Sequence, residues 1–340
     1  MRAALLRSPG NLEIVSRPRP VAGPGQALLR VRAAAVCGSD VHAYKGDSAF
    51  QVYPAVLGHE VAGEVVELGE GVQSLSLGDH AVLDPMIRCG HCYPCRQGRY
   101  NCCTSLKVMG VHTDGGFADY VAVDADHLYR IDARVPFETA ALVEPLCIAA
   151  QAVSRGRVGP EDRVLVIGAG TIGLGVLLMA KAAGARVASS DTVASKLRLA
   201  QQLGADLTID AASEDVGKAV LGWTDGDGPS VVIEAVGHPA TTRAALDYVS
   251  AAGRVVVVGI TPQDVPLPIP LFIRKEMDLL ASRNSREQFP RVIALVESGR
   301  IDPTPIISHR FPLEQAPQAL HLLSQPGTPV RKAVLSFAQP

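Results

Sequence analysis

The sequence predicts an α/β protein in which a β-rich unit precedes a doubly wound parallel sheet. In the first 150 residues, Gly and Pro separate short apolar runs, which favours a compact all-β or barrel-like unit. After residue 150, short strand patterns alternate with helical stretches. A G-x-G-x-x-G motif also stands where the first of these strands meets a helix.

The predicted elements follow in order along the chain. Leu28–Ala33 alternates between apolar and polar residues, and Val61–Leu68 is a β-rich run that contains a glycine. Arg163–Ile167 is an apolar run, as expected for a strand buried on both faces. The six strands expected in the second part are 163–167, 186–190, 207–209, 231–236, 254–258 and 277–281. Helices are expected over 171–183 and 194–203, each followed by a glycine.

The last part of the chain is less regular. Prolines between Pro262 and Pro270 exclude a central strand or helix, so we expect a loop over a sheet edge or at a subunit contact. From about Arg286 we expect a helix, then a short strand around Ile306–Ile307 and a second helix over Leu313–Leu323.

Composition excludes several classes of function. The 340 residues suffice for about two domains, and 32 Lys+Arg against 34 Asp+Glu give a net charge of −2. This balance argues against binding to nucleic acid or an anionic membrane, and 4% aromatic residues argue against a base-stacking surface. Neither a membrane-spanning run nor a signal peptide is recognisable. We therefore expect a soluble, cytoplasmic protein that acts on a small molecule.

The seven cysteines favour metal binding. Their number is odd, so they cannot all pair within the chain, and five of them lie within fifteen residues. Cys89, Cys92, Cys95 and Cys103 have a spacing that suits four thiolate ligands, as in closed structural zinc sites. The adjacent Cys102 is an alternative fourth ligand.

The glycine motif predicts a dinucleotide site. Gly168 permits a tight turn, Gly170 allows backbone to approach a pyrophosphate, and Gly173 allows the helix to pack on the strand. The helix that begins at Thr171 and Ile172 offers N–H groups and a partial positive charge to phosphates.

Asp191 favours NAD over NADP. It ends the second strand of the sheet, where a carboxylate accepts hydrogen bonds from ribose hydroxyls and repels an added phosphate. Lys196 has two open interpretations: it lies beside the adenosine, or it is a solvated helix lysine.

Three scattered features suggest a second metal site. Cys37, the pair His59 and Glu60, and Glu144 supply a thiolate, an imidazole and carboxylates, which can bind zinc with one position open. An open position admits a substrate oxygen and lowers its pKa. Taken alone, each residue is more often structural, and the separations along the chain decide nothing.

Together these motifs resemble those of the zinc-containing medium-chain alcohol and polyol dehydrogenases. The resemblance covers essentially the whole chain. It is carried by the pattern from Gly58 to Val72, the cysteine lobe 89–103, and the runs 115–120, 168–173 and 203–206.

The resemblance implies a GroES-like catalytic domain, formed by residues 1–149 and 286–340, and a Rossmann NAD-binding domain over 150–285. It also implies two zinc ions per chain. Cys37, His59 and Glu144 match the catalytic zinc positions, and Cys103 matches the fourth structural ligand. Glu60 matches a residue that binds zinc directly in some relatives and indirectly in others, so either Glu60 or Glu144 is the third ligand.

The same resemblance assigns a proton relay to Ser39 and His42. A histidine suits that task because its pKa lies near neutrality. The alternatives are a turn serine and a structural histidine.

Glu144 stands where ethanol-oxidising relatives have cysteine, so the substrate is expected to be polyhydroxylated. The likeness is greatest to bacterial L-gulonate and L-galactonate 5-dehydrogenases, and Arg283 could bind a substrate carboxylate. The alternatives are a polyol (sorbitol, xylitol or butanediol) dehydrogenase or an L-threonine dehydrogenase. A non-catalytic NAD-binding protein is disfavoured because Cys37, His59 and Glu144 are all present.

The family is usually dimeric or tetrameric through sheet edges, and we expect the run Gly253–Gly259 to supply such an edge in a homodimer or homotetramer.

Overall fold

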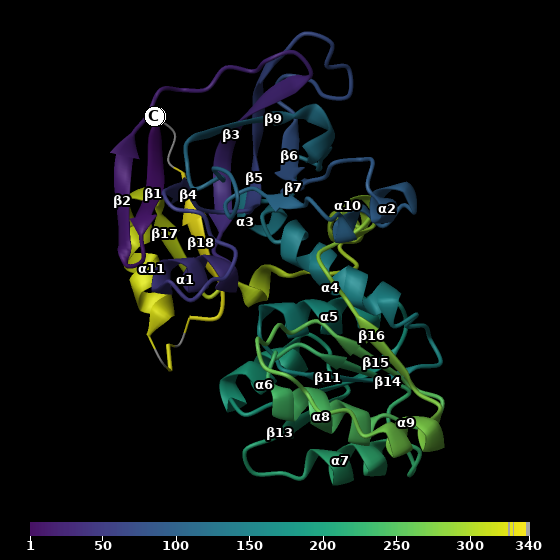
Figure 1. Ribbon diagram of the computed structural model, residues 1–340. Coiled ribbons are helices and arrows are strands. Elements are labelled where there is room, and N and C mark those ends of the chain that lie inside the picture. Colours follow the sequence, from purple (N-terminus) through teal and green to yellow (C-terminus); the bar gives the residue numbers. More distant parts are fainter. Residues whose placement is uncertain (326, 329, 338–340) are drawn as a thin grey trace. The chain divides into compact units, whose positions relative to one another are not determined.

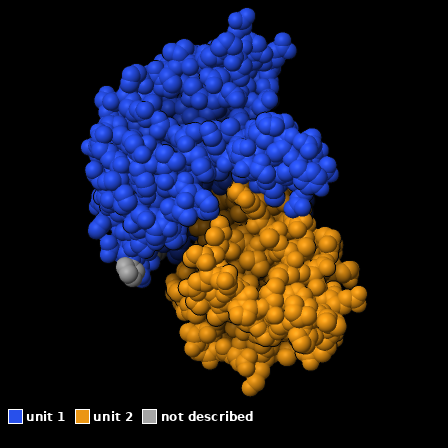
Figure 2. Space-filling view, in the orientation of Figure 1, with its two compact units in different colours: residues 1–144, 289–340 blue, residues 145–288 orange. Residues whose placement is uncertain are grey.

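The computed structural model describes residues 1–325, 327–328 and 330–337, and the chain divides into two compact units. Unit 1 contains residues 1–144 and 289–340, and unit 2 contains residues 145–288 (Figure 2). The boundaries expected from the sequence, 150 and 286, lie a few residues away. Each unit has its own cluster of buried apolar side chains.

The main sheet of unit 1 is mostly antiparallel. Among the described residues its strands run in the order β10-β6-β5-β3-β18-β17, and β9 also pairs with β3 (Figure 1). The predicted strands at 28–33 and 61–68 are confirmed as parts of β3 and β5. The strands are β3 (Gln26–Ala35), β5 (Glu60–Leu68), β6 (His80–Leu83), β9 (Tyr120–Asp124), β10 (Leu128–Arg130), β17 (His309–Pro312) and β18 (Ala333–Ser336).

Shorter elements complete unit 1. The smaller sheets contain β1 (Arg2–Ser8), β2 (Asn11–Ser16) and β4 (Ala55–Val56), and β7 (Met86–Ile87) with β8 (Lys107–Val108). Its helices are α1 (Gly38–Lys45), α2 (Tyr93–Arg96), α3 (Phe137–Ala140), α10 (Phe289–Glu297) and α11 (Ala316–Ser324).

Unit 2 is the predicted doubly wound sheet. Within the described residues 145–288, six parallel strands run in the order β13-β12-β11-β14-β15-β16. They are β11 (Arg163–Ile167), β12 (Arg186–Asp191), β13 (Leu207–Asp210), β14 (Val231–Glu234), β15 (Arg254–Val257) and β16 (Asp278–Ala281). The helices are α4 (Val143–Arg155), which begins in unit 1, α5 (Thr171–Ala182), α6 (Ala194–Gln202), α7 (Val216–Trp223), α8 (Pro239–Tyr248) and α9 (Ile269–Lys275).

Two sequence predictions are wrong. The strand expected at Ile306–Ile307 is replaced by a 3₁₀ turn over Thr304–Ile306, because Pro303 and Pro305 fix turn-like backbone and lack the N–H groups of a strand. The strand forms later, as β17. The run Gly253–Gly259 is not an edge, because β15 lies between β14 and β16; the edge strands of this sheet are β13 and β16.

Smaller differences concern helix starts. Helix α9 begins at Ile269, inside the expected loop, and tolerates Pro270 because the first turn needs no N–H donor there. The helix expected from Leu313 begins with a 3₁₀ turn and becomes α-helical at Ala316. Among the described residues, no helix has the length and apolar character needed to cross a bilayer.

Candidate metal centres and cofactor site

Pairing of β3 with β5 brings the first three candidate ligands together. Ala35, the last residue of β3, lies opposite Glu60, the first residue of β5. Cys37 follows β3 by two residues and His59 precedes β5 by one, so this register places them side by side. Ligand atoms of Cys37, His59 and Glu60 lie within 4.8 Å of one another, and His59 and Glu60 are buried.

Asp40 supports this cluster, and sequence inspection missed it. Its buried carboxylate accepts hydrogen bonds from Cys37 N (2.8 Å) and Gly58 N (3.3 Å) and lies 3.8 Å from His59 Nδ1. Burial raises the pKa of Asp40, although His59 opposes that rise. An acidic residue in the first turn of the helix after Cys37 is the signal that could have identified it.

Lys332 is the second residue that sequence inspection missed. It lies just before β18, whose pairing with β3 places it beside Val36. Lys332 is 2% exposed, and its ammonium group forms an ion pair with Glu60 and donates to the Val36 carbonyl at 3.0 Å. Burial lowers the pKa of Lys332, but Glu60 and Cys37 outweigh burial and raise it above its ordinary value.

Glu144 lies near the cluster but outside the set of atoms within 4.8 Å. It is buried at the start of α4, and burial raises its pKa to about 8, against an opposing effect of His59 and with a further rise from Glu60. Of the two carboxylates left open by the sequence, the structure therefore groups Glu60 with Cys37 and His59.

The donor set fits zinc. It combines a thiolate, an imidazole and a carboxylate, the ligand types of catalytic zinc sites. Burial lowers the pKa of His59, but Cys37 and Asp40 outweigh it and raise the pKa well above the ordinary value. His59 Nδ1 is buried, has no hydrogen-bond partner among the described residues and lies 3.8 Å from the Asp40 carboxylate.

Ser39 and His42 lie on α1, next to this cluster in the chain. Ser39 Oγ is 3.5 Å from His59 Nε2, whereas the exposed His42 ring places Nδ1 2.8 Å from Asp47 Oδ1. The two side chains thus have different neighbours in the structure, and the relay through them stays a prediction.

The cysteine lobe forms a separate and more uniform centre. The sulfur atoms of Cys89, Cys92, Cys95 and Cys103 lie within 4.8 Å of one another, and Cys102 is outside this set. Cys103 Sγ is 3.5 Å from Cys89 Sγ and 3.8 Å from Cys92 Sγ, too far for disulfides.

Local backbone shapes this lobe. Gly90 and Gly98 have φ of +77° and +70°, so they turn the chain around the sulfur atoms. Backbone N–H groups of Thr104 and Cys95 lower the pKa of Cys92 to about 5, whereas burial raises the pKa of Cys95 to about 12. Four thiolate-capable side chains fit tetrahedral zinc with no open position. The His91 ring instead contacts the Cys89 carbonyl at 2.8 Å.

The glycine motif of unit 2 has the geometry of a dinucleotide cradle. Gly168 has φ of +96°, and a Cβ on Gly173 would lie 1.8 Å from the Gly168 carbonyl oxygen. A Cβ on Gly170 would meet nothing within 4 Å, so the backbone is approachable there. Helix α5 begins at Thr171 and Ile172 without a side-chain cap, which leaves its N-terminus suited to an anion.

Asp191 lies at the end of β12, beside this cradle. Its carboxylate accepts from Ala169 N at 2.8 Å and Val193 N at 2.9 Å, and Lys196 Nζ lies 3.7 Å away. Asp191 therefore fixes the glycine loop and retains oxygen lone pairs for a ligand hydroxyl. Arg283, the predicted carboxylate ligand, is exposed just after β16.

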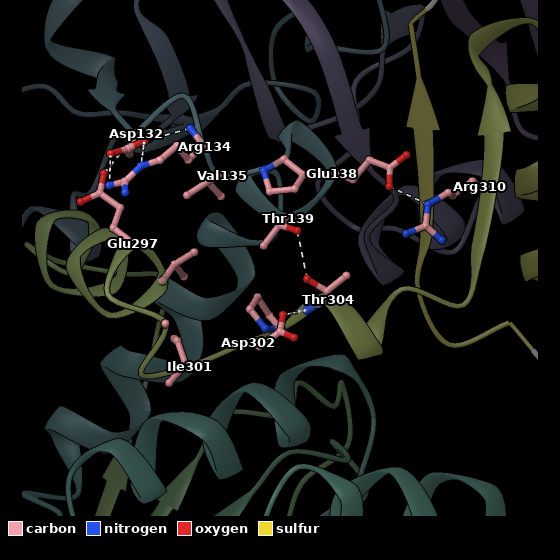
Figure 3. A pocket seen from close by; sticks show the side chains of 14 residues that line it. Asp132, Arg134, Val135, Glu138, Thr139, Glu297, Ile301, Asp302, Thr304 and Arg310 are labelled. Atoms are coloured by element: carbon pink, nitrogen blue, oxygen red, sulfur yellow. Dashed lines mark hydrogen bonds and ion pairs between the residues drawn. The ribbon is translucent and has the colours of Figure 1, made fainter.

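A separate pocket of about 430 Å³ in unit 1 contains none of the predicted site residues (Figure 3). Four of its charged side chains form two ion pairs: Arg134 with Asp132 at 2.7 Å, and Arg310 with Glu138 at 2.5 Å.

Comparison with known proteins matches both units. Residues 23–133 match the family model of the alcohol dehydrogenase GroES-like domain, and residues 171–298 match that of the zinc-binding dehydrogenases.

Relatives cover nearly the whole chain. The L-galactonate-5-dehydrogenase of Escherichia coli K12 is 36% identical over 92% of both chains. The L-threonine 3-dehydrogenase of Pyrococcus horikoshii is 38% identical over 92% of this chain and 91% of its own. An E. coli CFT073 alcohol dehydrogenase, RspB, solved with NADH, has a TM-score of 0.93 and 34% identity over 99% of both chains.

Proposed function

The chain belongs to the zinc-containing medium-chain alcohol dehydrogenase family, and on that premise we propose that it oxidises a secondary alcohol of a sugar acid with NAD⁺. The observation that carries this proposal is the cluster of the half-buried Cys37 with the buried His59 and Glu60, with Glu144 and Lys332 beside it. Cys37, His59 and one of the two glutamates would hold a catalytic zinc. Cys89, Cys92, Cys95 and Cys103 would hold a structural one.

The chain's own residues supply the rest of the chemistry. We call Cys37, His59 and Glu60 the mixed cluster. A zinc ion bound there would lower the pKa of a substrate hydroxyl. Ser39 and His42 would then carry the hydroxyl proton toward solvent, since His42 is exposed and can release it. Asp40 and Lys332 keep His59 and Glu60 in fixed orientations, which preserves the ligand geometry through turnover.

Cofactor selection is assigned to unit 2. The glycine loop 168–173 and the start of α5 would hold the pyrophosphate of NAD⁺, which would supply the hydride acceptor when bound. Asp191 would accept from the adenosine ribose hydroxyls and disfavour the extra phosphate of NADP. Lys196, 3.7 Å from Asp191, lies close enough to border the same ribose.

The sugar-acid substrate is supported by the L-galactonate-5-dehydrogenase relative and by the exposed Arg283. A guanidinium can bind a carboxylate through two parallel hydrogen bonds. L-Threonine is the second candidate, because similarly close relatives are L-threonine 3-dehydrogenases and because threonine also carries a carboxylate.

A substrate panel tests this proposal. We expect NADH formation with L-galactonate or L-gulonate, and slower reaction with sorbitol, xylitol, butanediol and L-threonine. Arg283→Met should raise KM for the sugar acid and leave KM for a neutral polyol unchanged, with Arg283→Lys intermediate. Reduction of NAD⁺ by neutral polyols alone would contradict the sugar-acid assignment, and preference for L-threonine would select the second candidate.

We also propose that the protein is a homodimer or homotetramer built on the β16 edge. Among the described strands, β16 pairs only with β15, and its Leu279 is 37% exposed. The neighbouring α9 exposes Ile269 and Ile273, at 59% and 78%. Leu279→Lys should dissociate the assembly in sedimentation experiments. None of the seven cysteines, all within the described residues, forms a disulfide, as we would expect of a protein kept in a reducing cytoplasm.

A further inference from the structure

Glu234 connects two loops at the carboxyl end of the unit 2 sheet. It is the last residue of β14 and is fully buried. One oxygen, Oε1, accepts from Val236 N (2.9 Å), Gly237 N (2.9 Å) and the Thr241 hydroxyl (2.8 Å). Its backbone carbonyl accepts from the amides of residues 258 and 259 at 2.9 and 3.1 Å. We call residues 235–238 and 258–260 the edge loops; Thr241 lies in the first turn of α8, which follows the first of them.

The edge loops contact each other without space for side chains between them. A Cβ on Gly259 would lie 2.1 Å from Gly237 N, and a Cβ on Gly237 would lie 2.7 Å from the Ile260 carbonyl oxygen. The loops also reach the dinucleotide motif, because a Cβ on Gly168 would lie 2.7 Å from Val236 Cγ2. A shift of either loop would therefore change the surface beside the glycine motif 168–173, which we call the wall of the glycine cradle.

Two further observations connect this wall with a ligand. Val236, which lies beside Gly168, and Ile260, which lies beside Gly237, are 51% and 86% exposed and give the loops an apolar surface. Glu234 Oε2 is buried and has no hydrogen-bond partner among the described residues. Burial of a half-satisfied carboxylate costs stability, which points to a role of Glu234 in shaping the ligand site.

We propose that Glu234 is a positioning residue that sets the edge loops for the nicotinamide half of the cofactor. This inference rests on the proposed use of NAD⁺. In open α/β sheets, ligands bind outside the carboxyl ends of the strands, where these loops lie. The adenosine half is served by Asp191 on β12, on the other side of β11, so the two halves depend on different residues.

Binding measurements on the intact protein test the inference. NADH affinity is followed by NADH fluorescence, and 5′-AMP affinity by calorimetry as a probe of the adenosine half. Glu234→Ala leaves buried N–H groups without an acceptor, so we expect NADH affinity to fall about tenfold or more. Affinity for 5′-AMP should stay within about twofold. Glu234→Gln keeps an oxygen acceptor and should restore most of the NADH affinity.

Thr224→Val is the matched control. Thr224 is buried at the opposite end of the same unit, where its hydroxyl donates to the Val220 carbonyl at 2.6 Å and accepts from Gly228 N at 2.8 Å. Its loss should lower thermal stability and leave both affinities unchanged. Thr241→Val, which removes one donor to Glu234, provides a milder variant if Glu234→Ala does not fold.

The outcomes are distinguishable. Equal weakening of NADH and 5′-AMP in the Glu234 variants, or no weakening of either, overturns the positioning role. Wild-type protein that binds neither ligand would contradict the proposed cofactor as well.

Discussion

The two metal centres of unit 1 contrast in how the chain builds them. The cysteine lobe takes four identical ligand types from one loop of fifteen residues. The mixed cluster takes Cys37, His59 and Glu60 from the ends of two paired strands, and Lys332 from the C-terminal segment. A uniform, closed set suits a structural ion, whereas a mixed set surrounded by buried charges suits chemistry.

Loss of a ligand should have the largest effect and should separate the two centres. Cys37→Ser removes the thiolate from the mixed cluster, and we expect turnover to fall by about 10³-fold or more, because metal-assisted charge stabilisation is lost. Thermal stability should change little, since serine is a good N-cap for α1. Steady-state kinetics and calorimetry measure the two effects.

Cys103→Ser is the counterpart in the lobe. Here we expect a lower unfolding temperature and rapid proteolysis within residues 88–106, because the loop has little apolar burial of its own. A variant that kept normal protease resistance would contradict a structural ion in the lobe.

The sequence alone accounted for the lobe better than for the mixed cluster, and the reason is physical. Ligands within one loop meet whatever the rest of the fold does, so cysteine spacing identified three of the four. It left the fourth open between Cys102 and Cys103, and the family resemblance favoured Cys103. The choice between Glu60 and Glu144 depends on the register of β3 against β5, which spacing does not encode. Asp40 and Lys332 were missed because charged side chains are usually solvated, and only the fold shows that they are buried.

The fold shows the same difference between features that are local in the sequence and features that depend on how strands pair. The central strands β11, β14 and β15 were the most predictable in unit 2, because each is a short, mostly apolar run, as burial on both faces requires. Which strand lies at the sheet edge is a property of topology, so the edge was assigned to residues 253–259 instead of β16.

Loss of the buried charge of Lys332 is a second way to distinguish the two centres. The cysteine lobe has no comparable buried cation among its described neighbours. Lys332→Met leaves Glu60 without its partner, and we expect the metal-free protein to lose about 3–5 kcal/mol of unfolding free energy. Lys332→Arg should retain most of it. Added zinc should recover part of the loss in Lys332→Met, since it replaces the missing positive charge. Denaturant titrations with and without zinc measure this; equal stability of all three proteins would show that the ion pair contributes nothing.

A chelator should remove zinc from the two centres at different rates. A site with an open position exchanges its ion more readily than a closed set of four thiolates. During dialysis against a chelator, we expect activity to disappear before the lobe becomes protease-sensitive. The reverse order would mean that the assignments are exchanged.

Cys102→Ser should have the smallest effect. Cys102 neighbours the lobe but lies outside its sulfur cluster. We expect zinc content, stability and turnover to match those of the wild-type protein, in contrast to Cys103→Ser. Loss of zinc from this variant would make Cys102 the fourth ligand.

Zinc counting by native mass spectrometry tests the central claim most directly, because it separates the two centres without any assumption about substrate. The account predicts two zinc ions per chain in the wild-type protein and one in each of Cys37→Ser and Cys103→Ser. The two single variants should retain different ions, so the double variant should hold none. A wild-type protein with one ion, or a Cys37→Ser variant that still holds two, would contradict it.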